Sequence, residues 1–450
     1  MANAFGALGA DPVSAAINPA GFGLYRSSTI SLSPAVEVNA SKTRYYNTAD
    51  AATQSRMYFS NMALVLHYPG KSGSDWKSST FGIVYDRRQG YHWSTEASGD
   101  VPSTILQRFV DEAEGTPYTS VVDDLPFTAG LAWNAYGMDT LTGQAASYFS
   151  YIPVGSTTRQ RHVIESTGRN AHTSFFYAGN YKDKLYLGMQ LGVLSHRFER
   201  TMTHLENTLD QTLDIASAIF KEKLVTTGSG FDVKAGFLVR VTERFRTGAS
   251  FHSPQWLLLN DAYVNQLNTT WRTPDSEGNY AYEAVSPDGT FAYRLITPWR
   301  TTVSAAYLAG TNGSVSVDYE YADMGAMHFR AANQLEALYD FDAENNLIKQ
   351  RFQAVHSVRV GTEWRAGDMY YRAGWGFVPD AYKSTDPLHA GAQKTYSAGI
   401  GYRSEHLTID LGLNYVLQST PFFPYSPDLV QAVNEERASY RTFLTFALRP

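Results

Sequence analysis

Apolar and polar residues alternate with a period of two through most of this chain, and a stretch of this kind predicts a β-strand with two different faces. The longest clear case covers residues 407–417, where every second side chain is apolar. Residues 231–239 and 369–377 repeat the arrangement, with glycine and charged residues on the second face. Strands of this length can cross a bilayer. A soluble sandwich would need mostly shorter strands, so the pattern predicts a barrel with an apolar outside and a polar inside.

The connections between the predicted strands fall into two classes, as they do at the two rims of an outer-membrane barrel. The short connections are residues 181–184, 242–244, 310–313, 365–368 and 403–406. The long connections are the neighbourhood of residue 50 and residues 93–157, 201–224, 254–290, 324–350, 379–394 and 418–437. We expect the short turns to face the periplasm and the long loops to face the outside.

Strict alternation of short and long connections gives an all-β fold, a transmembrane antiparallel β-barrel of about fourteen strands. The predicted strands are residues 27–40, 54–68, 79–92, 160–180, 184–200, 224–240, 243–254, 291–309, 313–323, 351–364, 368–378, 395–403, 406–418 and 438–448. Residues 125–136 also resemble a strand, but one more strand would make the count odd. We therefore assign them to an external helix or loop, because Pro126 suits a helix start.

Residues 1–26 precede the first predicted strand and lack a periodic apolar pattern. They are rich in glycine and alanine, and Asp11-Pro12 and Asn18-Pro19 are turn signals. A barrel of this size has a lumen wider than wall side chains alone fill, so we expect residues 1–26 to form a plug, or hatch, inside a barrel of residues 27–450. The opening residues show no export signal, which fits a start from which such a signal has been removed.

Composition excludes several other classes of protein. The chain has 43% hydrophobic and 18% charged residues, yet no apolar run is long enough for a membrane-spanning helix. The net charge of -6 is spread without basic runs, so we expect no nucleic-acid partner. Without cysteine, the chain has no disulfide, no thiolate metal site and no cysteine nucleophile. Its 11 histidines are scattered and no nucleophile motif is present, so we expect no enzyme activity, no metal site and no cofactor.

The order of several motifs resembles the FadL-type outer-membrane transporters of long-chain fatty acids and aromatic hydrocarbons. Asn18, Pro19, Ala20 and Gly21 match the Asn-Pro-Ala motif of that family's hatch. The resemblance also covers residues 6–11, 181–191, 231–250, 297–299, 315–323 and 397–415. It implies a Gram-negative outer-membrane location and a hatch inside the barrel. It further implies that hydrophobic molecules are captured outside, move through a pocket and leave sideways through a gap in the wall. The hatch begins later here, and the loop of residues 93–157 is longer.

Asn18, Pro19, Ala20 and Gly21 are the candidate hatch motif, with two interpretations. The Asn18 side chain can anchor the plug by binding backbone groups, as asparagine does in turns. Alternatively, the turn belongs to a hinge that opens the path. The sequence leaves both open.

Apolar stripes in the long loops supply candidate ligand-capture residues. The i, i+4 spacing from Leu205 to Phe220 predicts an amphipathic helix, and residues 101–110 and 125–133 are further predicted helices. An apolar groove that faces water suits the first capture of a lipid. Equally, these helices can bury their stripes against one another and cap the barrel. The capture candidates are Phe109, Leu131, Trp133, Leu209, Leu213 and Phe220.

Charged residues of both signs occur on the predicted inner face, and paired charges that brace the plug are one explanation. An unpaired arginine could instead bind a carboxylate head group in bidentate fashion. The candidates for this second role are Arg240, Arg246, Arg359 and Arg372.

Proline and glycine mark candidate distortions of the wall. Pro34 and Pro298 fall inside predicted strands, where each removes a ladder donor. The kinked strand of the resembling family is the third, where Gly82 and Gly90 are the weak points here. Either proline, or the third strand, is a candidate for the lateral exit, although a strand end explains the prolines equally well.

Two functions remain open. The first is passive import of a hydrophobic small molecule, most simply a long-chain fatty acid, through a barrel that contacts outer-membrane lipid. The second is a non-transporting barrel that serves as a scaffold for a secretion or surface-assembly system. An apolar tunnel from the mouth to a wall gap favours the first function. A lumen packed with charged side chains favours the second.

Overall fold

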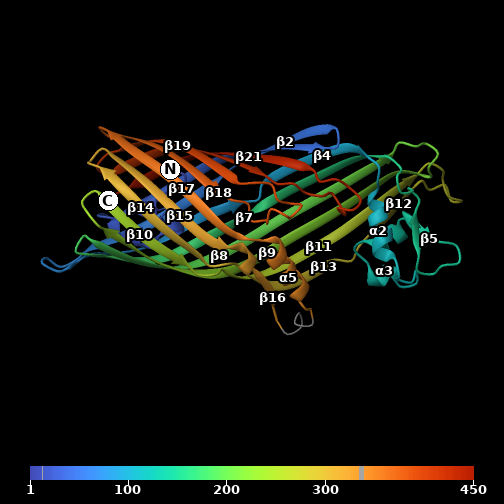
Figure 1. Cartoon of the computed structure of the whole chain (residues 1–450), viewed down its shortest axis with the longest axis horizontal. Helices are drawn as coiled ribbons and strands as arrows, with labels where there is room; N and C mark the ends of the chain where they lie inside the picture. Colours follow the sequence, from blue (N-terminus) through green and yellow to red (C-terminus); the bar gives the residue numbers. More distant parts are fainter. Residues whose placement is uncertain (13, 334–338, 450) are drawn as a thin grey trace.

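The computed structural model describes residues 1–12, 14–333 and 339–449. They form a closed antiparallel barrel of 14 strands (Figure 1). Some of these strands are interrupted, so that two or three labelled strands follow one another along one barrel strand. The first six barrel strands are β1 (Thr29–Tyr45), β2 (Thr48–Pro69), β3 with β4 (Trp76–Gly90, Trp93–Val101), β7 (Thr158–Tyr181), β8 (Leu185–Thr208) and β9 (Ile215–Arg240).

The remaining barrel strands complete the circle, because β21 pairs with β1 along most of its length. They are β10 with β11 (Phe245–His252, Trp256–Trp271), β12 with β13 and β14 (Ala281–Val285, Gly289–Ile296, Arg300–Ala309), β15 with β16 (Gly313–Asp323, His328–Ala331), β17 (Ala354–Ala366), β18 (Met369–Val378), β19 (Gln393–Arg403), β20 (Leu407–Ser419) and β21 (Asn434–Leu448). The strand count and the antiparallel barrel predicted from the sequence are confirmed.

The alternation of side chains sets the two faces of the wall. On β8, Leu187 and Met189 are exposed on the outside, whereas Tyr186 and Gln190 are buried in the lumen. Further along the same strand the outward residues become charged, as the ion pair of Arg197 with Glu199 shows. The apolar exterior is therefore a band that ends partway along the strands. Among the helices of the described residues, none is both long and apolar enough to span a membrane.

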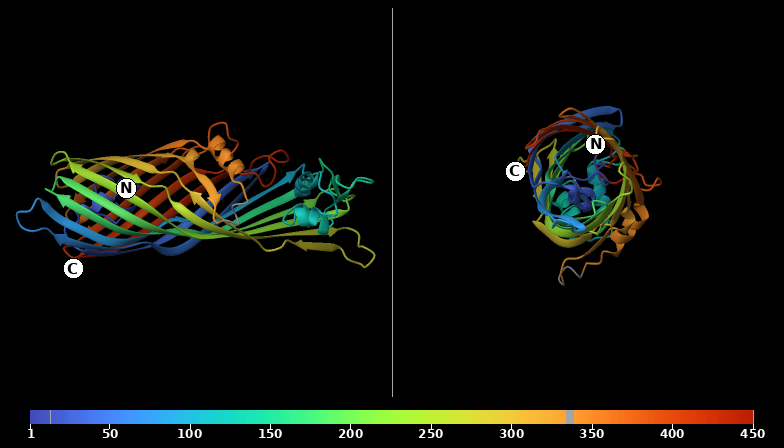
Figure 2. Two further views of the ribbon diagram at one scale, coloured as in Figure 1. Left: turned by 90° about the horizontal axis from the view of Figure 1, so that it is seen from below. Right: turned by 90° about the vertical axis from the view of Figure 1, so that its left-hand side faces the viewer.

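Strands β7, β8 and β9 are 24, 24 and 26 residues long and extend the wall well beyond this band (Figure 2). The predicted helix over residues 205–220 is therefore wrong, because Leu205 pairs with Ile219 in the β8–β9 ladder. A spacing of four residues places side chains on one face of a helix, but it also places them on one face of a strand. Likewise, the predicted loops 254–290 and 324–350 contain β11, β12 and β16.

Residues between β4 and β7 form a small lid at the end of the barrel opposite the chain termini (Figure 1). Its apolar core packs against the extended strands and contains Phe109, Leu131, Ile152 and Phe220. The assignment of residues 125–136 to a helix or loop is confirmed. The lid elements are α2 (Ile105–Ala113), α3 (Val121–Asp124), α4 (Ala129–Asn134), β5 (Met138–Thr140) and β6 (Tyr148–Ser150).

The N-terminal segment lies inside the barrel near the short turns (Figure 2). It contains α1 (Ser14–Ile17) and the 3₁₀ helix η1 (Pro19–Leu24). Between β15 and β17 the chain forms η2 (Met324–Ala326) and α5 (Asp342–Arg351), and α5 lies outside the wall (Figure 1). The hatch and the lid thus occupy opposite ends of one lumen.

Candidate functional site

The Asn18 side chain joins three parts of the structure. Its Nδ2 donates to the carbonyl oxygens of Gly6 (3.0 Å) and Phe237 (3.1 Å), and its Oδ1 accepts from the backbone N–H of Ala20 (3.1 Å). Asn18 therefore caps η1, holds the preceding hatch segment and attaches both to strand β9. This arrangement matches the anchor interpretation of the hatch motif, whereas the hinge interpretation concerns motion and stays a prediction.

Two wall glycines leave room for this turn. Gly188 and Gly236 face each other across the β8–β9 ladder. A Cβ atom on Gly188 would lie 2.3 Å from the backbone N of Ala20, and one on Gly236 would lie 2.2 Å from Oδ1 of Asn18. No side chain fits at such distances, so glycine is required at both positions. The sequence placed glycine on the inner face but did not show which glycines contact the hatch.

Buried polar side chains of the wall hold the carbonyl groups of α1. Lys234 Nζ donates to the carbonyl of Ala15 (2.8 Å). Ser250 Oγ donates to the carbonyl of Ile17 (2.7 Å), and His252 Nε2 lies at the same distance from that oxygen. These contacts use backbone atoms of the hatch, so its sequence alone could not reveal them.

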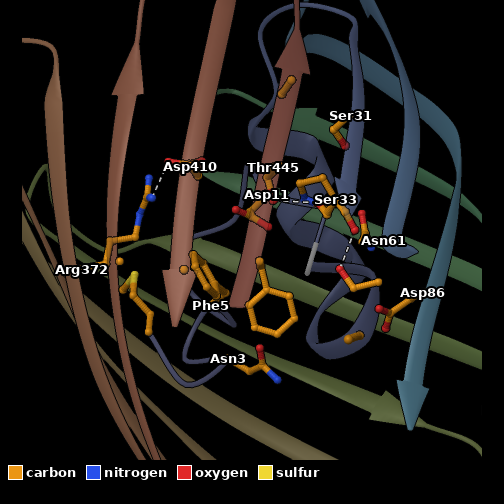
Figure 3. Close-up of a pocket in the computed structure, with 18 of the residues that line it drawn as sticks. Asn3, Phe5, Asp11, Ser31, Ser33, Asn61, Asp86, Arg372, Asp410 and Thr445 are labelled. Carbon is orange, nitrogen blue, oxygen red and sulfur yellow. Dashed lines mark hydrogen bonds and ion pairs between the residues drawn. The ribbon is translucent and has the colours of Figure 1, made fainter. Parts of the chain in front are cut away.

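A cavity of about 720 Å³ lies between the hatch and the wall (Figure 3). Phe5 of the hatch and Phe443 of β21 give it apolar surface, and serine and threonine side chains such as Ser31 and Ser33 give it polar surface. Four carboxylates line it, namely Asp11, Asp86, Glu320 and Asp410. Nine arginines line it, namely Arg26, Arg87, Arg88, Arg300, Arg359, Arg372, Arg403, Arg441 and Arg449. The lining therefore favours a ligand that combines an apolar part with an anionic group.

Two of the predicted carboxylate-binding arginines are already paired. Arg372 contacts Glu363 (2.5 Å) and Asp410 (2.6 Å), and Arg359 contacts Glu320 (3.2 Å). Both arginines line the cavity, where their pairing braces the wall. The other two candidates, Arg240 and Arg246, do not line this cavity.

The wall is not fully hydrogen-bonded beside the cavity. Strands β2 and β3 pair from Pro69 with Ser78 as far as Asn61 with Asp86. Beyond that point, residues 48–60 of β2 pair with β1, while β4 pairs with β7. No ladder between β2 and β4 is present among the described residues. Residues 48–60 of β2 and strand β4 are therefore not joined by ladder hydrogen bonds. We call this interruption the wall gap.

Side chains rather than ladder bonds fill the wall gap. Arg56 NH1 (3.2 Å) and Arg87 NH2 (2.9 Å) both donate to the carbonyl of Gly168 on β7. Both guanidinium groups also lie over the ring of Tyr58. Because Tyr58 and Arg87 line the cavity, the cavity extends to the wall gap.

The four candidate distortions have different surroundings. Pro34 lies at a register shift of the β1–β2 ladder. Gly90 ends β3, just after a register shift between Arg87 and Gln89. Pro298 lies between β13 and β14, so the prediction of one unbroken strand there is wrong. Gly82 pairs on both sides and shows no break. Of the four, Gly90 lies nearest to the wall gap, because the Arg56 guanidinium occupies the space where a Cβ atom of Gly90 would lie.

The predicted capture residues do not form one exposed groove. Phe109, Leu131 and Phe220 are buried in the lid core, with Trp133 and Leu213 packed against it. Leu209, between β8 and β9, is the one exposed residue of the six, at 41% of its full accessible surface. The alternative prediction, in which the apolar stripes face one another and cap the barrel, matches these positions.

Glu206 of β8 fastens the lid to the wall. Its fully buried carboxylate accepts hydrogen bonds from Thr104 Oγ1 (2.6 Å) and from the backbone N–H of Ile105 (2.7 Å) at the start of α2. Gln160 Nε2 and His204 Nε2 lie 2.9 Å from the same carboxylate. An anion at a helix N-terminus is favourable, and burial strengthens the interaction.

His162 extends this network beyond the apolar band. Its Nδ1 lies 3.2 Å from Nδ1 of His204. The neighbouring Arg161 forms an ion pair with Glu96 on the outer surface, so this part of β7 is outside the membrane-facing region. Burial, and to a smaller extent the adjacent His204, hold the pKa of the His162 imidazole well below its usual value. His162 is therefore neutral in the folded protein at neutral pH.

No family model and no curated protein sequence matches the chain. Solved structures do match it. A FadL homologue of Pseudomonas aeruginosa is 12% identical, with 99% of this chain and 95% of that chain covered and a TM-score of 0.55. The toluene transporter TodX of P. putida is 13% identical, with coverages of 98% and 94% and a TM-score of 0.53. The toluene transporter TbuX of Ralstonia pickettii is 12% identical, with coverages of 100% and 98% and a TM-score of 0.51.

Proposed function

We propose that this chain, which has the fold of the FadL-type outer-membrane transporters, carries hydrophobic small molecules passively across the outer membrane of a Gram-negative bacterium. The observation that carries the proposal is the cavity beside the hatch, which extends to the wall gap. The apolar exterior band supports a membrane location, since such a surface is stable in lipid.

The proposed route begins at the external loops and ends at the wall gap. A ligand passes the lid, occupies the cavity and leaves sideways after the hatch or the gap side chains move. The gap begins beside Met57 and Phe59, whose exposed side chains belong to the apolar band. A ligand that leaves there meets lipid rather than water.

Long-chain fatty acids are the proposed substrates. The neighbouring structures include transporters of toluene, which is uncharged. Here the cavity offers Phe5 and Phe443 for an apolar chain and an excess of arginine for a carboxylate. A fatty acid satisfies both parts of the lining, whereas a hydrocarbon leaves the arginines without a ligand partner.

Complementation tests this function. The full chain is expressed in a Gram-negative host that lacks its own fatty-acid importer, and uptake of labelled oleate and labelled toluene is compared. Folding is verified by the altered gel migration of the unheated barrel. We expect oleate uptake above that of the empty vector. Correctly folded protein in the outer membrane that raises uptake of neither compound would overturn the proposal.

One observation favours the second candidate, a scaffold for secretion or surface assembly. The lumen is braced by buried ion pairs, including Glu37 with Arg56 (2.5 Å) and Arg441 (2.6 Å). A barrel without uptake activity, but with a reproducible partner in the cell surface, would establish this role.

A further inference from the structure

Two arginines face each other on the inner wall at the short-turn end of the barrel. Arg240 of β9 and Arg246 of β10 are direct cross-strand partners. They share a face with Gly236 and Gly248, which contact the Asn18 side chain of the hatch. Like charges placed directly opposite each other are destabilising, so this pair requires compensation.

No carboxylate supplies that compensation within the described part of the chain. Some other lumen arginines form ion pairs, as Arg359 and Arg372 do, whereas neither Arg240 nor Arg246 is within ion-pair distance of an acidic side chain among the described residues. The Nε atoms of both are buried and have no hydrogen-bond partner. Arg246 NH1 donates to the carbonyl of Leu8 (3.2 Å), and Arg240 lies against the ring of Tyr186. Neither contact neutralises a positive charge.

A second cavity of about 140 Å³ is lined by Arg240 and by the end of the hatch, and Arg246 is the cross-strand neighbour of Arg240 rather than part of the lining. Its lining contains three cations, Arg26, Lys77 and Arg240, and one carboxylate, Asp183. Asp183 is itself engaged, since its Oδ1 accepts from Asn180 Nδ2 (2.9 Å). With Arg246 across the ladder, positive charge exceeds negative charge around a space large enough for a small anion.

We propose that Arg240 and Arg246, assisted by Arg26, bind an oxyanion of the carboxylate or phosphate class. Guanidinium groups bind both kinds of anion through paired hydrogen bonds, and the desolvated surroundings strengthen such bonds. Neither Arg240 nor Arg246 lines the larger cavity, whereas Arg26 lines both cavities. The site does not depend on whether the chain transports fatty acids.

A bound anion would connect the hatch to the wall. Arg26 lies two residues after the end of η1, and Arg246 already contacts the hatch at Leu8. Arg240 is anchored on β9, where its backbone N–H donates to Lys184 (2.8 Å). One anion held between these side chains replaces mutual repulsion with attraction, so it stabilises the closed hatch.

Calorimetric titration of the full chain in a neutral detergent tests the site, with inorganic phosphate and octanoate as separate probes. The variants are Arg240→Gln and Arg246→Gln. The matched control is Arg244→Gln, which makes the same charge change at an exposed position of the connection between β9 and β10. We expect each site variant to bind about tenfold more weakly or worse, and the control to bind as the wild type does. A response to only one probe identifies the class of anion.

Thermal unfolding provides a second measurement. A ligand that binds the folded state raises the melting temperature, so the effective probe should stabilise the wild type and the control but not the site variants. Absence of binding by both probes would overturn the proposal. So would binding that folded Arg240→Gln and Arg246→Gln proteins retain in full. Because no uptake is measured, failure here is distinguishable from failure of the transport proposal.

Discussion

The ring of Phe22 in the hatch lies flat against the ring of Phe176 on β7, with 3.6 Å between the centroids and 9° between the planes. Both side chains are buried, so this contact contributes apolar burial to hatch docking. The barrel ladder does not depend on it. A change at Phe22 therefore separates hatch docking from barrel stability.

Replacement of Phe22 by Ala should loosen the hatch by about 3–5 kcal/mol, the usual cost of a buried Phe→Ala change. Hydrogen exchange of residues 14–24 should become faster, while exchange of the β8–β9 ladder stays unchanged. Exchange measured by mass spectrometry checks both. Unchanged protection of the hatch would contradict the docking role of this ring.

The Gly236→Ala change should displace the Asn18 turn, because the added Cβ would lie 2.2 Å from Oδ1 of Asn18. The matched control is Gly412→Ala on β20, where the nearest atom to the new Cβ is 3.7 Å away. Hatch cleavage by an added protease should increase in the first variant and not in the second. Equal cleavage of the two variants would show that the wall glycines do not determine hatch position.

A disulfide can test whether the hatch must move. The chain has no cysteine, and a Cβ on Gly376 would lie 3.8 Å from the Cβ of Ala2, close to the disulfide mean. Oxidised Ala2→Cys/Gly376→Cys protein should lose most of its fatty-acid uptake, and a reductant should restore it. The single variants are the controls. Full uptake by the oxidised protein would show that the first residues of the hatch stay in place during transport.

Lid docking should weaken in acid. His162 adjoins His204, which contacts the Glu206 carboxylate that holds α2, and burial lowers the pKa of His162 in the folded state. A form in which the lid is undocked and His162 is exposed to water therefore binds more protons below the usual value of 6.5. Docking free energy should therefore fall by up to about 1.4 kcal/mol per pH unit as the pH drops below this value. Hydrogen exchange of residues 105–134 between about pH 5 and pH 8, corrected for intrinsic rates, measures the change.

Substitution of His162 by Gln removes the titrating group and should flatten this pH profile. The control is His389→Gln in the loop between β18 and β19, where the ring is exposed. It should retain the wild-type profile. A wild-type lid whose exchange is independent of pH would contradict the role of His162.

The barrel could be predicted from the sequence because the signal is local: a two-residue period reports the two faces of a strand wherever it occurs. The prediction failed over residues 205–220, where the four-residue spacing fits helix and strand alike. The contacts of Asn18 with β9 and the ion pair of Arg359 with Glu320 could not be predicted, because they join residues 219 and 39 positions apart whose pairing depends on the strand register. For the same reason, the sequence could not separate the paired Arg372 from the unpaired Arg240.

The wall gap has a mechanical consequence. Ladder hydrogen bonds make neighbouring strands move together. Strands β2 and β4 are joined instead by side-chain contacts such as that of Ser98 with Asp50. Side chains can rotate away and return without breaking the backbone network on either side. The barrel can therefore open locally between β2 and β4, while the ladder hydrogen bonds hold the other strands together.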